Sequence, residues 1–134
     1  MVRVFLHKLL REEYTPKETK ALSDDFKQYK EHGVLPPTFG RDVPYSHTHN
    51  RRSLELMHLH YKGRGFKLSL LQFYRTSGYV LVYCPGFTDS NTYLLITIIK
   101  HFNPKQPDIV TGTDRDDNLM AKLEAIAEGF REKF

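Results

Sequence analysis

Four segments in the second half of the chain carry the hydrophobic patterns of β-strands. Apolar and polar positions alternate, or run apolar, over the length of a strand in residues 54–62, 67–75, 79–84 and 92–101. Short stretches that contain glycine, serine, proline or asparagine separate these segments and supply turns. Strands joined by such short links pair as antiparallel neighbours, so the pattern predicts a four-stranded antiparallel meander.

Two other segments carry apolar residues at the spacing of an amphipathic helix. Thr15 and Glu18 have the spacing of a capping box, Pro16 suits the first helical position, and Gly33 is placed to end the helix. Residues 116–134 carry a continuous apolar stripe, with acidic residues near its start and basic residues near its end, as the helix dipole favours. We therefore predict one helix before the meander and one after it.

The remaining segments complete the expected order of elements. Residues 2–6 predict a short opening strand, while residues 38–53 are polar and weakly periodic, which is typical of a loop with at most a short helical turn. Residues 102–115 contain two prolines and a glycine and predict a surface connection. The chain is thus expected to be a single α+β domain over residues 1–134, with the order strand, helix, four-stranded meander, helix and with the helices on one face of the sheet.

The composition fits one globular domain with a mild preference for anionic partners. Of 134 residues, 40% are hydrophobic, and 20 Lys and Arg against 16 Asp and Glu give a net charge of +4, which is weak support for nucleic-acid binding. The single cysteine, Cys84, excludes an intrachain disulfide and a multi-cysteine zinc site. No apolar run is long enough to span a membrane and the N-terminus lacks a secretory signal, so we expect a cytoplasmic protein without a membrane partner.

The sharpest chemical feature is the pair His58 and His60 in the first strand of the predicted meander. Residues two apart in a strand face the same way, so both imidazoles project from one face, while Met57, Leu59 and Tyr61 can face the helices on the other. Near neutral pH one imidazole can accept a proton and another can donate one. Cleavage of RNA through its own ribose needs both steps, because a base takes the 2′-OH proton and an acid protonates the leaving 5′-oxygen. The alternative interpretation is a pair of surface or half-buried histidines without a chemical role.

Two further residues complete the candidate catalytic set. Arg75, at the end of the second predicted strand, has a guanidinium that can hold the scissile phosphate in a bidentate grip and stabilise its added charge. Tyr83 lies in the third predicted strand, on the same face as Tyr79. The non-catalytic alternatives are a solvated hairpin end for Arg75 and a place in the core or at its rim for Tyr83.

Basic and aromatic residues in the irregular segment and at the strand ends are candidates for contact with RNA or the ribosome. An aromatic ring among basic groups on a loop can stack on an unpaired base while the cations clamp the backbone. The candidates are Arg41, Tyr45, Arg51, Arg52, Lys62, Arg64 and Lys100. For the loop members, the alternative is ordinary packing with a local ion pair between Arg41 and Asp42.

The number of histidines makes a metal site a further candidate. His47 and His49 precede His58 and His60 with the same His-x-His spacing, and two such pairs on adjacent elements can bind zinc or copper. His47 and His49 lie in a segment without a clear period, however, and no glutamate is placed to assist them. We therefore expect no metal and no other cofactor, and we keep a His-x-His metalloenzyme as an alternative function.

In combination, several stretches resemble the YafO family of toxins from bacterial type II toxin–antitoxin pairs. They run over nearly the whole length and include VRVF, DDFKQYKEHGVLPPTFGRD, Tyr45, the HLH strand, QFYRT, LVYC, LLITIIK and DDNLMAKLEAIAEGFREKF. The stretch YRTSGYVLVY is also similar to the central hairpin of RelE-like toxins. The resemblance implies a RelE-like fold, cleavage of mRNA on the translating ribosome, a small cognate antitoxin, and binding of the toxin–antitoxin pair to its own promoter DNA.

The chain departs from the RelE-like pattern at positions that matter for catalysis. RelE-like toxins often carry an arginine directly after the Gly-Tyr of the hairpin, where this chain has Val80, and many carry lysines where it has Leu71 and Phe73. The RelE-type catalytic set therefore cannot be transferred whole, and the histidine pair with Arg75 takes its place. A ParE-like toxin that poisons a DNA topoisomerase without catalysis, and a plain interaction module, are the alternatives for the same fold. The histidine pair favours the enzyme.

Overall fold

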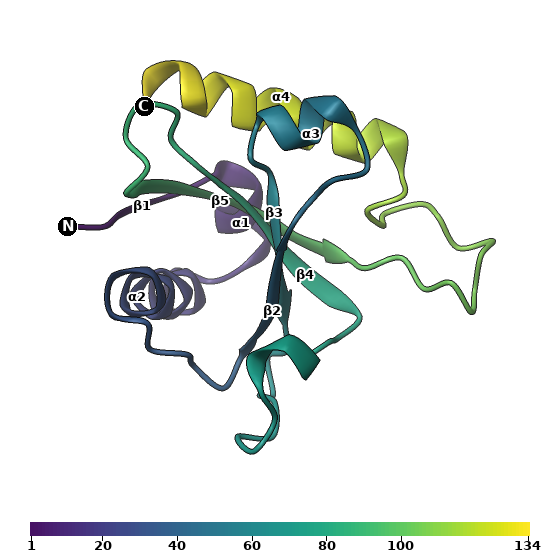
Figure 1. Ribbon diagram of the computed structural model, residues 1–134, viewed down its shortest axis with the longest axis horizontal. Coiled ribbons are helices and arrows are strands. Elements are labelled where there is room, and N and C mark those ends of the chain that lie inside the picture. The colour runs from purple at the N-terminus through teal and green to yellow at the C-terminus, as the bar shows by residue number, and fades with distance from the viewer.

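A five-stranded mixed sheet forms the centre of the computed structural model, which describes residues 1–134 (Figure 1). The strands are β1 (Arg3–Leu6), β2 (Phe39–Pro44), β3 (Met57–Tyr61), β4 (Tyr79–Pro85) and β5 (Thr92–Lys100). Their order across the sheet is β1-β5-β4-β3-β2, with β2 to β5 as successive antiparallel neighbours and β1 parallel to β5. The predicted α+β class and the antiparallel meander are confirmed, although one of the four strands of the meander is not the one expected.

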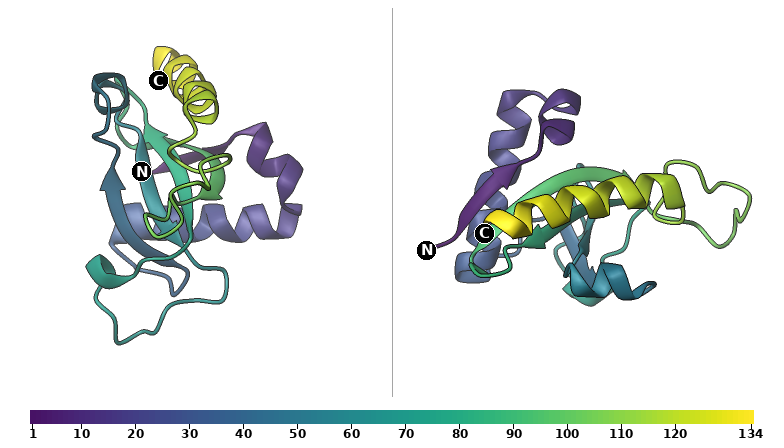
Figure 2. Two further views of the ribbon diagram at one scale, coloured as in Figure 1. Left: turned by 90° about the vertical axis from the view of Figure 1, so that its right-hand side faces the viewer. Right: turned by 90° about the horizontal axis from the view of Figure 1, so that it is seen from above.

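Helices cover both faces of this sheet. The helices are α1 (Lys8–Glu13), α2 (Pro16–His32), α3 (His49–Ser53) and α4 (Asp117–Lys133), with a short 3₁₀ helix, η1 (Gln72–Tyr74). In Figures 1 and 2, α1 and α2 lie on one side of the sheet, whereas α3 and α4 lie on the other. The expectation that the helices share one face is therefore wrong. None of these helices has the length and apolar character needed to cross a membrane.

The reason for two helical layers is that the central strands are apolar on both faces. One buried cluster joins α1 and α2 to the sheet and includes Leu10, Leu22, Phe26, Leu59, Leu81, Tyr83 and Leu95. The second joins α4 to the opposite face and includes Val80, Val82, Leu94, Ile96, Met120 and Leu123. Alternate residues of β4 thus enter different clusters, as the pleat of a strand requires. Burial of apolar area on both sides of β4 and β5 stabilises the three-layer arrangement.

The ends of the long helices follow the signals in the sequence. The Thr15 hydroxyl accepts a hydrogen bond from the Glu18 amide at 3.2 Å, and the Glu18 carboxylate accepts one from the Thr15 amide at 2.9 Å. Gly33 ends α2 with a φ of 68°, a left-handed conformation that glycine adopts without strain. Asp116 caps α4 by accepting a hydrogen bond from the Leu119 amide. These predicted boundaries are confirmed, whereas the six-residue helix α1 was not expected.

The strand predicted at residues 67–75 is wrong. This stretch forms turns and η1, and its apolar residues Leu68, Leu71 and Phe73 are exposed. Its place in the meander is taken by β2, which lies within residues 38–53, the segment expected to be irregular. The sequence of β2 is FGRDVP, whose polar residues hide the strand from a search for apolar alternation.

The first strand of the predicted meander is shorter than expected. It begins at Met57 rather than at residue 54, and the chain turns at Glu55, which has a φ of 51°. A positive φ interrupts the extended conformation of a strand. Leu54 and Leu56 are nevertheless buried, in the cluster beneath α4.

The displaced segment protects the outer edge of β2. The Arg41 amide donates a hydrogen bond to the Arg75 carbonyl at 2.8 Å, and the Gln72 side chain donates one to the Gly40 carbonyl at 3.0 Å. A Cβ atom at Gly40 would lie 2.2 Å from the Arg75 carbonyl oxygen, so the close approach requires glycine there. Covering an edge in this way removes unpaired backbone groups that would otherwise pair with another chain.

The packing of β3 against α2 gives the first testable prediction. Leu59 is fully buried, and Leu59→Ala should lower the free energy of unfolding by about 2–5 kcal/mol because the substitution leaves a cavity. Chemical denaturation measures this loss. Met57→Ala is the matched control on the same face, where the half-buried side chain should contribute less. Wild-type stability in Leu59→Ala would contradict the assigned packing.

Candidate functional site: a histidine cleft

Three histidines meet on the face of the sheet that carries α3 and α4. His58 and His60 come from β3, and His101 directly follows β5. Each histidine contributes one ring nitrogen to a group of three, and these three nitrogens all lie within 4.8 Å of one another. The ring centroids of His60 and His101 are 5.0 Å apart, and those of His58 and His60 are 6.1 Å apart.

The pairing of three strands produces this meeting. His60 lies opposite Val80 of β4, and the His101 amide donates a hydrogen bond to the Gly78 carbonyl at 2.9 Å. His101 therefore arrives beside the histidine pair through the register of β4 with β5. His101 was not predicted from the sequence, because it follows an apolar strand and no local spacing links it to His60.

The histidines line an open cleft of about 590 Å³, which we call the histidine cleft. Its lining includes Arg41, Ser46, His58, His60, His101, Asn103 and residues 76–78. On the other side of β3, Met57, Leu59 and Tyr61 pack in the cluster with α1 and α2. The predicted division of this strand into two faces is confirmed.

His60 is held by the backbone of Ser77. The side chain of His60 is buried, and the residue is only 5% exposed. Its Nδ1 lies 3.0 Å from the Ser77 amide nitrogen and 3.2 Å from the Ser77 carbonyl oxygen, so it accepts from the amide in one tautomer and donates to the carbonyl in the other. Burial lowers the pKa of His60, nearby His101 adds to this effect, and the Ser77 contact opposes it. Because Ser77 offers both a donor and an acceptor to the same nitrogen, the ring can keep its orientation in the neutral and the protonated form.

His58 is the most perturbed of the three histidines. Its ring stacks on Tyr45 with a centroid distance of 4.1 Å and an angle of 18° between the planes. Burial lowers the pKa of His58 to about 4, against an opposing effect of Asp114. The ring is therefore neutral at neutral pH. Its Nδ1 is buried without a hydrogen-bond partner, which is rare for a buried polar atom.

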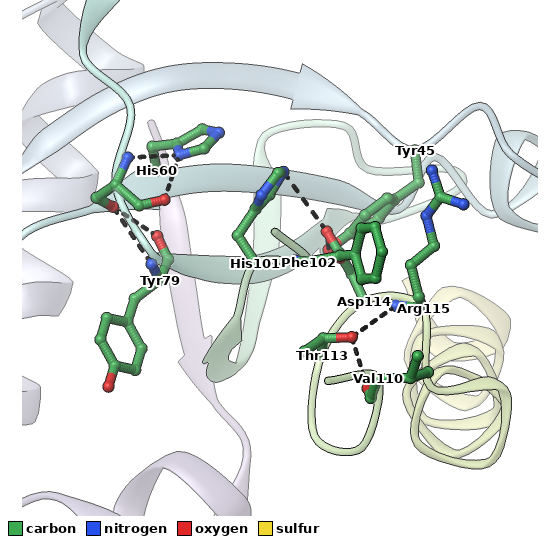
Figure 3. A network of polar contacts seen from close by, with 10 residues as sticks. Tyr45, His60, Tyr79, His101, Phe102, Val110, Thr113, Asp114 and Arg115 are labelled. Carbon is green, nitrogen blue, oxygen red and sulfur yellow. Dashed lines mark hydrogen bonds and ion pairs between the residues drawn. The ribbon is translucent and has the colours of Figure 1, made fainter. Parts of the chain in front are cut away.

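His101 is paired with a buried carboxylate. Its Nε2 lies 3.8 Å from Oδ2 of Asp114, which is close enough to form an ion pair with the protonated ring (Figure 3). Asp114 is fixed in turn, because it accepts a hydrogen bond from the Phe102 amide at 2.9 Å and one from the Tyr45 hydroxyl at 3.5 Å. The carboxylate is thus placed to orient the His101 ring.

Arg41 supplies the cation of the cleft. Its guanidinium lies over the ring of Phe73, with 4.1 Å between the guanidinium carbon and the ring centroid. The Nε atom of Arg41 is buried without a hydrogen-bond partner, and the side chain lines the cleft with the histidines. A planar guanidinium in this position can bind an anionic group such as a phosphate.

Arg75 and Tyr83, the other predicted catalytic residues, lie outside the histidine cleft. Arg75 is 5% exposed, and its guanidinium donates hydrogen bonds to the carbonyl groups of Leu68, Leu70, Pro36 and Phe39. Its donors are therefore used to hold the chain that covers β2. Tyr83 is buried on the opposite face of the sheet, where its hydroxyl donates to Asp42 at 2.7 Å. The structure contradicts the grouping of either residue with His58 and His60.

The predicted RNA-binding residues divide into buried and exposed members. Tyr45 is buried beneath His58, and Arg51 is buried against Glu124 of α4 with 3.5 Å between Nε and the carboxylate. The structure shows that Tyr45 packs on His58 and that Arg51 joins α3 to α4, while contact of these two residues with RNA stays a prediction. Four members remain exposed: Arg52, Lys62, Arg64 and Lys100.

The histidines that the structure brings together are not the two His-x-His pairs that were considered as metal ligands. His47 and His49 are exposed and stay apart from His58 and His60. The three histidines of the cleft are geometrically compatible with three nitrogen ligands of a divalent cation. The single cysteine, Cys84, is buried in the core cluster beneath α4, and burial raises its pKa to about 12.

Comparisons with known proteins connect this fold and cleft to a family. A family model described as toxin YafO of a type II toxin–antitoxin system matches residues 27–132. The mRNA interferase toxin YafO of Escherichia coli (strain K12) is 38% identical over 139 residues, an alignment that covers 99% of this chain and 100% of the relative. No solved structure matches the chain. The family match over most of the chain and the full-length relative show that this protein belongs to the YafO family of type II toxin–antitoxin toxins.

Proposed function

We propose that this protein is a toxin that cleaves mRNA as an endoribonuclease on the translating ribosome. The observation that carries the proposal is the histidine cleft, in which proton donors and acceptors lie beside the guanidinium of Arg41. The relative from Escherichia coli is named an mRNA interferase, which supports RNA as the substrate. We also propose that the arrangement of sheet and helices is RelE-like.

His60 is the proposed general base. A base must be neutral to accept the 2′-OH proton, and burial favours the neutral form of His60. The freed 2′-oxygen then attacks the neighbouring phosphorus atom. This role uses the tautomer in which Nδ1–H of His60 donates to the Ser77 carbonyl oxygen, 3.2 Å away, so that Nε2 carries the free lone pair that accepts the proton.

His101 is the proposed general acid. Its protonated ring donates a proton to the leaving 5′-oxygen as the bond between phosphorus and that oxygen breaks. The Asp114 carboxylate, 3.8 Å from Nε2, is placed to orient the ring for this transfer. The products are a 2′,3′-cyclic phosphate and a 5′-hydroxyl. Base and acid are thus neighbouring imidazoles in different electrostatic surroundings, a division that favours opposite roles.

Arg41 and His58 complete the proposed site. The Arg41 guanidinium can bind the phosphate and stabilise the charge that develops on its oxygens in the transition state. His58 is the remaining member of the predicted pair, and its unpartnered Nδ1 supports a role in hydrogen bonding to the substrate. Its pKa of about 4 makes it a weaker base than the chemistry favours near neutral pH.

We propose a reaction that needs no metal, although the three histidines also support a second candidate mechanism. The proton transfers above use only the side chains of the cleft. A divalent cation bound by the three imidazoles would instead act on the phosphate or on a water molecule. A ParE-like role is not favoured, because a non-catalytic toxin has no need for this cleft.

Dependence on the ribosome has a physical reason. A net charge of +4 and few exposed cations near the cleft provide few contacts with free RNA. The ribosome can present mRNA in a fixed geometry, and correct orientation contributes several kcal/mol or more to rate enhancement. Arg52, Lys62, Arg64 and Lys100 are proposed to contact phosphates of mRNA or the ribosome. The other proposed partners are a cognate antitoxin and, through the complex with it, promoter DNA.

The substrate and chemistry can be tested together by primer extension. Wild-type protein should cleave mRNA in the presence of ribosomes, and cleavage should fall strongly without them. A 2′-deoxy nucleotide at the cut site should block the reaction, because it removes the attacking oxygen. A 5′-phosphate at the new end would contradict the proposal, since it indicates attack by water.

Metal dependence needs a matched control in the same assay. Treating the purified protein with a zinc chelator, and then returning it to ribosomes in sufficient magnesium, should leave the cleavage rate unchanged. Loss of cleavage that only zinc restores would favour the metal mechanism over proton transfer by the imidazoles.

Substitution of the histidines tests their proposed roles. His60→Ala and His101→Ala should each lower the rate of ribosome-bound mRNA cleavage by about 10²–10⁴-fold, because each removes a positioned acid or base. His58→Ala should also lower the rate and should relieve toxicity. Single-turnover cleavage and thermal melting should be measured together, because a folded but inactive variant separates chemistry from stability. His49→Ala, an exposed histidine outside the cleft, is the control and should cleave normally.

Wild-type rates in His60→Ala and His101→Ala would show that these histidines are structural. The mRNA endonuclease proposal would then need another site. Retained binding of the antitoxin provides an independent check that each variant keeps its fold.

The two arginines should respond differently to substitution. Arg41→Ala should lower the cleavage rate by about 10²–10³-fold with little loss of stability, because its guanidinium faces the cleft. Arg75→Ala should lower the melting temperature, because several main-chain carbonyls lose their donor. Measuring the rate below the melting temperature of each variant separates the effects. A stable Arg75→Ala variant with lost activity would restore Arg75 to the catalytic set.

A further inference from the structure

A second pocket lies across the turn of residues 76–78 from the histidine cleft. It has a volume of about 560 Å³ and we call it the aromatic pocket. Three tyrosines and two cations line it: Tyr14, Tyr61, Tyr79, Lys62 and Arg64. Residues 76–78 line both the histidine cleft and the aromatic pocket. The two sites are therefore separated only by this turn.

The sheet itself produces the cluster of tyrosines. Tyr61 ends β3 and Tyr79 begins β4, and the register that pairs His60 with Val80 brings their backbones together. The pleat of the sheet directs the side chains of both tyrosines to the face opposite the histidines. In Figure 3 the side chain of Tyr79 points away from His60. Tyr14, at the end of α1, closes the pocket from the helical side.

Ser77 connects the two sites. Its backbone holds Nδ1 of His60, with contacts of 3.0 and 3.2 Å. Its hydroxyl lies 2.7 Å from the Tyr61 carbonyl oxygen and 2.8 Å from that of Tyr79. One residue thus fixes the proposed base and the backbones of two pocket tyrosines, so the distance between the two sites is set by a rigid turn.

We infer that the aromatic pocket binds an unpaired RNA nucleotide next to the scissile phosphate. This inference rests on the proposed function, because it assigns a subsite to the RNA that the histidine cleft cleaves. A strand that crosses the turn of residues 76–78 can leave its scissile phosphate among the histidines and insert a neighbouring base between the tyrosines.

The chemistry of the pocket fits a nucleotide. Tyrosine rings stack on bases of any identity, because every base has a π-face. Tyr79 is 52% exposed, so its ring is available to a ligand. Lys62 and Arg64 are exposed at the rim and can pair with the phosphates that flank an inserted base.

The charges around the pocket also give the RNA a direction. Tyr14 and Tyr61 extend into an adjoining cavity that is lined by Glu18 and Asp25 of α2. Carboxylates on that side repel the backbone of RNA, whereas the cations on the opposite rim attract it. The base therefore points inward toward α2, and its phosphates remain with Lys62 and Arg64.

The test measures binding apart from cleavage. The probes are fully 2′-O-methylated RNA tetranucleotides with 2-aminopurine at each position in turn, since they cannot be cleaved and their fluorescence changes on stacking. Wild-type protein should bind at low salt, and Tyr79→Ala should weaken Kd by about 5- to 100-fold, the loss expected for one stacked base. Tyr79→Phe keeps the ring and should bind as wild type does.

Two further variants make the outcome specific. Phe87→Ala removes an equally prominent exposed aromatic ring outside the pocket and should not affect binding. His49→Ala removes an exposed histidine outside both sites and should bind the probe as wild type does. Binding that depends on Tyr79 therefore supports the pocket even if wild-type protein fails to cleave mRNA on ribosomes, which would overturn the proposed function alone.

Two results would overturn the inference. In the first, wild-type protein does not bind the probes at low salt. In the second, Tyr79→Ala binds them as tightly as wild type does, and if the same variant also weakens the antitoxin complex, the pocket belongs to the antitoxin.

Discussion

Each side chain of β3 points to one of two faces according to the register in which the strand pairs with β4. A slip of one residue would exchange the faces, placing His58 and His60 among the apolar residues beneath α2 and turning Leu59 into the cleft. The same register sets Tyr61 beside Tyr79 and fixes the turn at Ser77. The buried residues on both faces of β4 therefore hold the hydrophobic clusters and the histidine cleft in place together.

The histidine cleft shows how a fold can accommodate ionisable groups without a large loss of stability. Three imidazoles close together repel one another when charged, and burial adds a cost for each charge. Burial lowers the pKa of His58 to about 4 and also lowers the pKa of His60, which favours their neutral forms. His101 differs from both in lying 3.8 Å from the Asp114 carboxylate. This difference in surroundings suits a reaction in which one imidazole accepts a proton and another donates one.

The segment that follows β3 contributes to the site through structure rather than chemistry. Arg75 binds main-chain carbonyls, and its own carbonyl pairs with Arg41 in β2. Phe73 in the same segment lies beneath the Arg41 guanidinium and orients it. An arginine expected to touch phosphate thus helps to position another arginine that can. Gly40 allows this close approach, because any side chain there would collide with the segment.

The sequence by itself determined the elements whose signals are local. The capping box at Thr15, the glycine end of α2, the amphipathic helix α4 and the strongly apolar β5 were predicted because each depends on neighbours along the chain. The two faces of β3 followed from the period of a strand, and resemblance to the YafO family followed from motifs spread over the chain.

Tertiary structure alone decided the rest. The polar β2 is a strand because β3 and the chain up to Arg75 supply its partners, whereas residues 67–75, despite their apolar pattern, reach the edge of β2 through the Arg75 carbonyl and the side chains of Gln72 and Arg75. His101 joins His60, and Arg75 leaves the site, through pairings between residues far apart in the chain, which local periodicity does not record.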